Sequence, residues 1–368
     1  DEVYPSRPYD PWETLRRVVW LPFTGSDARG ATLGALAYAS DVVGLHSVAA
    51  AAWWGVSSGE PGRSATNPKA TARAGVSRSI SRSLAPVGIP GAVRGYAERA
   101  TTLSVSADLP FTTLDRAHTI SASYDLWLLE PFGQVRYDPG GPPVITPEAG
   151  RVAAVSLGWS YSNAFRFAHS ISPERGRRVE VQLRGGAPAL GGHFLFADAT
   201  AHAAQYLRVP RLAHHVVALR VAGGLGTGDL GGRRMFTLGG VEPRDPARDL
   251  LFGGRAGSIA LRGYPPAFRS GRAFVLGSAE YRLPVWAVER GLWTLPVYLR
   301  RIHAALFADA GDAFDPPARP SLRTGAGAEV RLETVLGYVL PADLRLGAAR
   351  GLSDGGIAQL YAAVGGVF

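Results

Sequence analysis

Hydrophobic and polar residues alternate along most of the chain with a period of two. The segment 322–336 shows this clearly, because its even positions are apolar or threonine and its odd positions carry all of its charges. Successive side chains of a β-strand point to opposite faces, so this pattern predicts a strand with one apolar and one polar face. The segments 119–128, 154–162 and 179–184 divide between two faces in the same way.

Fourteen such segments can be counted, and stretches rich in proline, glycine and aspartate separate them. Their centres lie near residues 36, 52, 76, 104, 124, 157, 183, 201, 220, 279, 304, 329, 347 and 362. Most are 10 to 15 residues long, whereas the usual strand has about 5 to 6 residues. The chain is therefore predicted to be all-β, and long strands with polar inner faces indicate a closed, transmembrane antiparallel β-barrel.

A soluble sandwich of two sheets is the alternative to a barrel, since it would hide the apolar faces between the sheets. Strand length favours the barrel, because about 9 to 11 tilted residues cross the hydrocarbon of a membrane. Aromatic residues near the segment ends favour it too, namely Trp53, Trp54, Trp127, Trp159, Tyr161, Trp286, Trp293 and Tyr298. Residues 42–59 have the length of a marginal membrane helix without a formal charge, but their glycines, serines and neighbouring strands argue against one.

Composition excludes several kinds of site. The 368 residues include no cysteine, which removes disulfides and thiolate metal sites. The net charge is +9, but the arginines are spread along the chain without a long basic run, so we expect no nucleic-acid partner. His193, His214 and His215 lack metal-ligand spacing with carboxylates. The adjacent His169 and Ser170 are poorly placed as a base and a nucleophile, so we expect no metal, no cofactor and no enzymatic activity.

The two ends of the chain carry further signals. Residues 1–30 are too short for a periplasmic module, and we expect them to be a lead-in from such a domain upstream of Asp1. At the other end, Leu360, Val364 and Phe368 share an uninterrupted apolar face. A last strand that ends in an aromatic residue resembles the terminal signal of bacterial outer-membrane barrels, and the alternative is simply a buried last strand.

A long connection without strand or helix pattern occupies residues of about 224–271. Long segments of this kind are usually functional or disordered. Disorder is an unattractive explanation here, because the connection contains Ile259, Leu261, Tyr264 and Phe268. The sequence therefore predicts an ordered loop, with the arginine beside Leu261 at its tip.

Three motifs, in order, resemble those of the BamA/TamA outer-membrane insertase and translocase superfamily. The first resembles the Val-Arg-Gly-Phe/Tyr motif of the family's sixth extracellular loop and consists of Leu261, Arg262, Gly263 and Tyr264. The second resembles Gly-x-x-Glu-Tyr-Arg-x-Pro on the next strand and consists of Gly277, Glu280, Tyr281, Arg282 and Pro284. The third resembles Phe-x-Asp-x-Gly on the strand after it and consists of Phe307, Asp309 and Gly311. The recognisable match covers residues of about 236–368.

The resemblance implies a barrel over residues 31–368 in the outer membrane of a Gram-negative bacterium, in contact with lipid and lipopolysaccharide. It implies sixteen strands, of which the missing two would come from residues 18–23 or from a division of one long segment. It also implies insertion or export of proteins, whose identity is unknown, through a weak seam between the first and last strands. The alternative function is a passive pore or a small-molecule transporter.

Strand parity supports a specific role for the loop. Glu280 and Asp309 are predicted to point into the lumen from adjacent strands. A guanidinium that reaches them can bind both carboxylates through charge-assisted hydrogen bonds. We therefore predict that loop six, residues of about 224–271, folds into the barrel and that Arg262 anchors it on Glu280 and Asp309. The alternative is that this contact only stabilises the barrel.

Overall fold

The computed structural model describes residues 19–26, 30–40, 47–66, 72–86, 93–134, 147–167, 169–233, 235–241, 260–336 and 340–364. Sixteen strands form one sheet in chain order, and β12 and β13 form a separate pair. The strands are β1 (Val19–Ser26), β2 (Ala31–Ser40), β3 (Ser47–Gly55), β4 (Pro61–Thr66), β5 (Ala72–Pro86), β6 (Val93–Thr112), β7 (Ala117–Gln134), β8 (Gly150–Ser162), β9 (Gly176–Gly186), β10 (Phe196–Arg208), β11 (Val216–Gly228), β12 (Phe236–Leu238), β13 (Arg269–Gly271), β14 (Ala273–Gly291), β15 (Val297–Phe314), β16 (Arg323–Leu336), β17 (Leu340–Gly351) and β18 (Ala358–Val364). A single 3-10 turn, η1 (Pro188–Leu190), accompanies them. In the part of the chain described, no helix is long and apolar enough to cross a membrane.

The all-β barrel class is confirmed, and so is the count of sixteen strands. Two of the sixteen strands, β1 and β4, were not among the fourteen segments counted from the sequence. Strand β1 contains residues 19–23 of the region 18–23, which was suggested as a source of further strands. The predicted barrel start at residue 31 is wrong. Strand β1 lies within residues 1–30, which were expected to be a lead-in, and it pairs with β2 along its whole length. The other extra strand, β4, escaped recognition because its sequence PGRSAT starts with proline and lacks apolar alternation. Residues 47–55 of the marginal helix candidate form β3.

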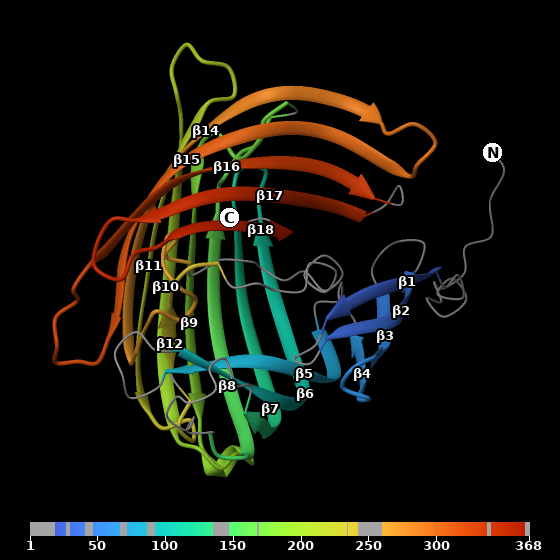
Figure 1. The fold of residues 1–368 in the computed structure, drawn as a ribbon, viewed down its shortest axis with the longest axis vertical. Coiled ribbons are helices and arrows are strands. Elements are labelled where there is room, and N and C mark those ends of the chain that lie inside the picture. Colours follow the sequence, from blue (N-terminus) through green and yellow to red (C-terminus); the bar gives the residue numbers. More distant parts are fainter. Residues whose placement is uncertain are drawn as a thin grey trace, which may run out of the picture.

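The expectation of a closed barrel is wrong for the described residues. The sheet order begins with β1 and ends with β18, and these two edges are not hydrogen-bonded to each other. Figure 1 shows the sheet as a strongly curved wall, with β1–β4 standing apart from β18. The ladder between β4 and β5 is short, and it spans only the register pairs from Arg63↔Arg78 to Thr66↔Gly75. A short ladder holds the first four strands weakly to the rest of the wall.

One face of the sheet carries a broad set of exposed apolar side chains. They include Val155, Leu157, Leu183, Leu219, Val221, Leu225, Leu306, Val330 and Leu346, all at least 39% exposed. An apolar surface of this extent is far larger than soluble monomers expose. It is the surface expected of a barrel wall that faces lipid.

Loop six lies on the opposite, inner face of the sheet. Within loop six, strands β12 and β13 pair with each other. Leu238, Leu261 and Tyr264 of the loop form a buried cluster with Phe274 and Leu276 of β14. Leu238, Leu261 and Tyr264 have no exposed surface. Through these three residues, loop six therefore shares a hydrophobic core with the inner wall.

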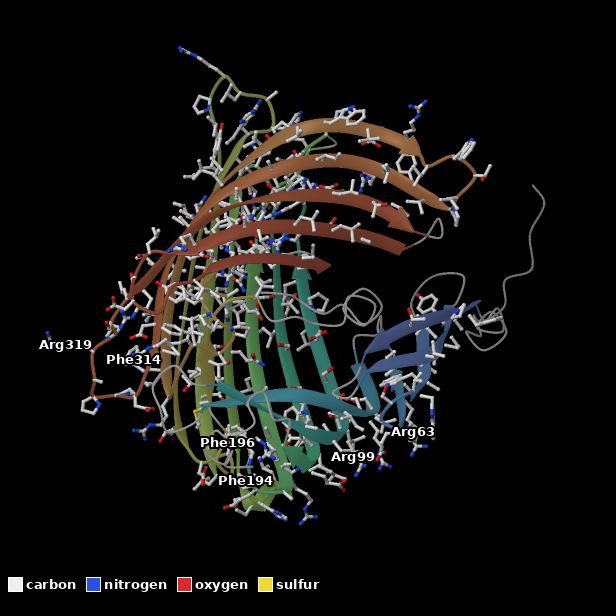
Figure 2. All side chains as sticks on the ribbon, in the orientation of Figure 1. Arg63, Arg99, Phe194, Phe196, Phe314 and Arg319 are labelled. Carbon is white, nitrogen blue, oxygen red and sulfur yellow. The ribbon has the colours of Figure 1, made fainter. Side chains whose placement is uncertain are left out.

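A second inner cluster lies beside η1, at the end of the wall where β9 turns into β10. It consists of Val152, Ala154, Phe194 and Phe196. Figure 2 shows Phe194 and Phe196 near the lower end of the strands in that view. Because β11 runs from the opposite end toward the same one, loop six begins beside this cluster, and Met235 packs against both clusters.

The connection between β8 and β9 lies at the end of the sheet opposite to loop six, and it also folds inward. Ser170 and Glu174 are buried in it, and the Ser170 hydroxyl donates a hydrogen bond of 2.6 Å to the Glu174 carboxylate. His214, in the turn between β10 and β11, lies 2.6 Å from the same carboxylate oxygen. Arg166 reaches across to Glu333 of β16 at 2.8 Å. Outer-membrane barrels usually have only short turns at the end opposite to their long loops. The β8–β9 connection is longer than such a turn and folds into the barrel.

We expect acid to loosen this connection. Burial alone would raise the pKa of Glu174, but its hydrogen bonds with Ser170 and His214 and the charge of Arg208 hold the pKa below its ordinary value of 4.5. A carboxylate with a lowered pKa in the folded state contributes stability above its unfolded pKa and loses that contribution as pH falls through the folded one. The contribution should therefore be complete above pH 4.5 and disappear below it.

The measurement is the heat-unfolding temperature of the folded barrel as pH is lowered from neutral to below 4. Glu174→Gln should remove part of the acid sensitivity, while the exposed Glu148→Gln should leave it unchanged. An identical loss of stability on acidification in Glu174→Gln and the parent would contradict the assignment.

Candidate functional site

Three carboxylates line the inner face of three neighbouring strands. Glu280 lies on β14, Asp309 on β15 and Glu329 on β16, and each is at most 3% exposed. Strand alternation places them opposite to the lipid-facing side chains, and the register pairs Ser278 with Asp309. The sequence predicted two of these carboxylates on adjacent strands, and the structure adds Glu329.

The guanidinium of Arg262 lies between these carboxylates. Its Nε and Nη2 atoms donate hydrogen bonds of 2.7 Å to the two Asp309 oxygens. Its Nη1 atom lies 2.9 Å from Glu280 Oε1 and 3.1 Å from Glu329 Oε1. Its Cζ atom stands 3.5 Å from the centre of the Phe307 ring. The structure thus brings together Arg262, Glu280 and Asp309, and Phe307 of the third motif forms the floor beneath them.

The two-ended contact with Asp309 matches the fork of a guanidinium to a carboxylate, a geometry that lysine cannot reproduce. Arg262 is only 4% exposed. A buried cation is tolerated only when it is paired and hydrogen-bonded. This arrangement therefore holds the backbone of loop six at one place on the inner wall.

Further arginines complete the network on the same face. Arg282 Nη2 and Arg331 Nη2 bind Glu280 Oε2 at 2.8 and 3.0 Å. Arg331 also binds Glu329 at 2.7 Å, and Arg345 of β17 binds Glu329 at 2.6 Å. Arg282 was expected only as a motif residue, and Arg331 and Arg345 were not predicted. Arg331 shares the charged face of segment 322–336, so its inward direction was visible, but its partner on another strand was not.

Glycines allow the backbone of the motif to lie directly on the strands. A Cβ atom on Gly325 of β16 would stand 2.1 Å from the carbonyl oxygen of Arg262. Gly263 has a φ of +91°, and a Cβ atom on it would stand 2.4 Å from the backbone nitrogen of Gly351. A positive φ and backbone contacts this close both require glycine. The motif is therefore seated on β16 and β17 by its main chain as well as by its arginine.

Tyr264 adds the next contact. Its ring has no exposed surface. Its hydroxyl donates a hydrogen bond of 2.8 Å to the carbonyl of Thr324 and accepts one of 3.1 Å from the backbone N–H of Ser353. Both partners are main-chain groups at the ends of β16 and β17, so Tyr264 ties the motif to the connections at this end.

Tyr264→Phe should lower the free energy of unfolding by about 1 to 2 kcal/mol, because the half-buried N–H of Ser353 loses its acceptor and the Thr324 carbonyl keeps only the N–H of Leu352. Urea unfolding in detergent measures this difference. Tyr298→Phe is the matched control, since its hydroxyl bonds the exposed Glu289 at 3.0 Å, and it should change stability much less. Equal effects of the two variants would show that the Tyr264 hydroxyl contributes nothing beyond the ring.

The other predicted motif residues do not join the network. Gly311 lies where a Cβ atom would meet the Val275 carbonyl at 2.7 Å and Leu238 of loop six at 3.0 Å, so it helps to seat the loop. Tyr281 points to the opposite side of β14 and bonds His215 at 2.7 Å. At Gly277 a Cβ atom would make only an ordinary van der Waals contact, with its nearest atom at 3.8 Å. Pro284 stands at a register shift between β14 and β15.

The terminal signal is only partly described. Leu360 is 87% exposed on β18, as a lipid-facing residue would be. Val364 pairs with Leu344 of β17, and Phe368 lies outside the described residues. Over the described ranges, no group of three or more His, Asp or Glu residues is arranged to hold a metal ion.

Solved structures show the same fold. BamA from Haemophilus ducreyi lacking POTRA domains 1–3 aligns with a TM-score of 0.54 at 12% identity, over 95% of this chain and 70% of that one. CdiB from Escherichia coli aligns with a TM-score of 0.57 at 14% identity, over 98% of this chain and 63% of that one. CdiB from Acinetobacter baumannii aligns with a TM-score of 0.50 at 12% identity, over 94% and 58%. The chain therefore spans less than two thirds of either CdiB.

Sequence comparison identifies the family. A search of curated proteins returned no match. The model of the Omp85 superfamily domain matches residues 150–339, which is more than half of the chain and includes the anchor motif and its three carboxylates. The chain belongs to the Omp85 superfamily and is a β-barrel protein of the Gram-negative outer membrane.

Proposed function

We propose that this barrel inserts or exports proteins at the seam between β1 and β18, and that its lumen is not an open conduit. The observation that carries the proposal is the seating of loop six on the inner wall, where Arg262 is buried among three carboxylates. A passive pore needs a water-filled lumen. An anchored loop occupies that space.

The two edges of the sheet support a seam. The described part of β18 is 7 residues long and pairs with β17 alone. At the other edge, β1 pairs with β2 alone. Three of the seven residues of β18 are alanine, and strands of small residues give neighbours little to pack against. An edge with free N–H and C=O groups is a template on which another strand can pair.

We further propose that a periplasmic domain acts with the barrel and receives the client. The support is that the BamA neighbour is described as lacking POTRA domains 1–3 and that this chain covers 70% of its length. The outer apolar face is proposed to contact lipid and lipopolysaccharide, because its exposed side chains match the hydrocarbon layer in polarity.

Photocrosslinking to a client tests the seam. A photoreactive amino acid replaces Trp20 of β1 or Leu360 of β18, which are 67% and 87% exposed. The matched control replaces Val221 on β11, which is 65% exposed and lies mid-wall. The probe is a small unfolded outer-membrane barrel protein, presented to proteoliposomes that contain the chain.

We expect client adducts at positions 20 and 360 and none at position 221, together with faster folding of the probe than in empty liposomes. Adducts at all three positions, or at none, would contradict the seam. A large, steady and ohmic conductance without accelerated folding would favour the passive pore instead.

A further inference from the structure

The last strand carries a tyrosine whose side chain crosses its neighbour. Register pairing aligns Glu329 of β16, Gly347 of β17 and Tyr361 of β18 in one row across the sheet. The Tyr361 hydroxyl donates a hydrogen bond to Glu329 Oε1. The ring passes over Gly347, where a Cβ atom would stand 2.3 Å from the ring carbon Cζ. The tyrosine therefore reaches two strands away only because the residue between is glycine.

The adjacent inward residue of β18 touches loop six itself. The side-chain oxygen of Gln359 accepts a hydrogen bond of 3.2 Å from the backbone N–H of Gly263. Its side-chain nitrogen donates one of 3.4 Å to the carbonyl of Val241. Gln359 and Tyr361 are two residues apart and so share the inner face. The inward side chains of the last strand thus contact either a carboxylate that binds Arg262 or the backbone of loop six.

Glu329 is the shared partner in this arrangement. It binds Arg262 Nη1 at 3.1 Å, Arg345 Nη2 at 2.6 Å and the Tyr361 hydroxyl. Charge-assisted hydrogen bonds are about twice as strong as neutral ones. The carboxylate therefore connects the position of the loop-six arginine to the position of the last strand.

We infer that Tyr361 and Gln359 are positioning residues that set the register of β18 and couple it to loop six. A slip of β18 by two residues keeps its inner face inward but moves Tyr361 from Gly347 to a position opposite Arg345 or Ala349. Each of those residues has a side chain on the inner face, where the tyrosine ring would have to lie. Strand register is weakly specified in small, flat strands, so a single large side chain over a glycine decides it.

This inference rests on the proposed function in one respect, since register control matters to clients only if β18 borders the seam. It implies that release of Arg262 loosens the last strand. It also implies that a client strand pairing with β18 meets a fixed register while loop six is seated.

Disulfide trapping in this naturally cysteine-free chain measures the register. Ala348→Cys with Leu360→Cys reports the native pairing, and Ala348→Cys with Ala362→Cys reports a slip of two residues. Both pairs lie on the outer face, away from the network. They are compared in the parent, in Tyr361→Phe and in Gly347→Ala, with hydrogen exchange of the β18 amides as a second readout.

The parent should trap only the native pair. Tyr361→Phe keeps the ring and loses the bond to a buried carboxylate, so β18 amides should exchange about tenfold faster. Gly347→Ala should displace the ring and raise the slipped pair. The control Tyr281→Phe, on the outer face of β14, should leave β18 unchanged. If Gly347→Ala fails to fold, the exchange rates of the β18 amides in Tyr361→Phe still test whether Tyr361 holds the last strand.

Native trapping and unchanged exchange in Tyr361→Phe would overturn the inference. Client adducts that persist at position 360 in that case would leave the proposed function standing. A loosened β18 without client adducts at positions 20 and 360 would support the inference and contradict the proposed function.

Discussion

Arg262→Ala should markedly lower the heat-unfolding temperature of the barrel and abolish its function. Among the described residues, the variant removes the guanidinium that hydrogen-bonds both oxygens of Asp309 and leaves this carboxylate the Ser278 hydroxyl at 2.7 Å. Breaking a buried ion pair by removing one partner costs about 3 to 5 kcal/mol, because a charge is left buried without compensation. Glu280 and Glu329 keep Arg282, Arg331 and Arg345, so the loss should concentrate on Asp309.

The gel shift between folded and heat-unfolded barrel measures this effect. Arg262→Lys should restore little, since an ammonium cannot make the forked bond to Asp309 while lying over Phe307. Asp309→Asn in the Arg262→Ala background should recover part of the stability but not the function, because it removes the unpaired charge without restoring the anchor. Arg272→Ala is the control, as its 51% exposed side chain stands 3.5 Å from Asp315. An Arg262→Ala barrel as stable as Arg272→Ala would disprove the anchor.

Gly325→Ala should release loop six and convert a plugged, poorly conducting lumen into a conducting one. The added Cβ atom would lie 2.1 Å from the Arg262 carbonyl oxygen. That oxygen belongs to the backbone, so no rotamer change relieves the contact, and the motif must rise from β16. Alanine suits the strand itself at least as well as glycine, so the wall should still assemble.

Conductance in planar bilayers separates the outcomes. The parent should show small and irregular openings, and Gly325→Ala should show a large and steady current. Gly185→Ala and Gly277→Ala are matched controls, because their added Cβ atoms have their nearest neighbours at 4.0 and 3.8 Å. A Gly325→Ala barrel that folds and conducts no more than these controls would mean that loop six does not close the lumen.

Alternation along the chain was sufficient to predict most of the wall. Segments such as 322–336 have one apolar and one charged face, so their direction and inward residues follow from parity alone. Glu280 and Asp309 could be placed together for the same reason. The short strand β4 has no such alternation, and β1 was recognised only as a region that could supply a strand.

The remaining features depend on how distant segments approach each other. Glu329 was visible as an inward charge, but its contact with Arg262 requires the loop to reach a third strand. Gly325 faces the carbonyl of Arg262, and Gly347 faces the ring of Tyr361. The alternation of residues along one segment cannot reveal such contacts with other segments. Closure failed as a prediction because alternation identifies the strands but does not report whether the first and the last of them pair.

Labelling of one buried cysteine tests the central claim most directly. Ala313 lies beneath loop six in the cluster with Leu238 and Tyr264 and is 1% exposed. In a chain without natural cysteine, Ala313→Cys can be treated with a water-soluble maleimide on the folded, purified barrel. Arg319→Cys is the accessible control, because Arg319 lies exposed in the connection between β15 and β16 (Figure 2). If loop six is seated on the wall, the cysteine at position 313 should not react with the maleimide in the parent and should react rapidly in Arg262→Ala and Gly325→Ala. A reaction at position 313 of the parent as rapid as that at position 319 would contradict the seated loop.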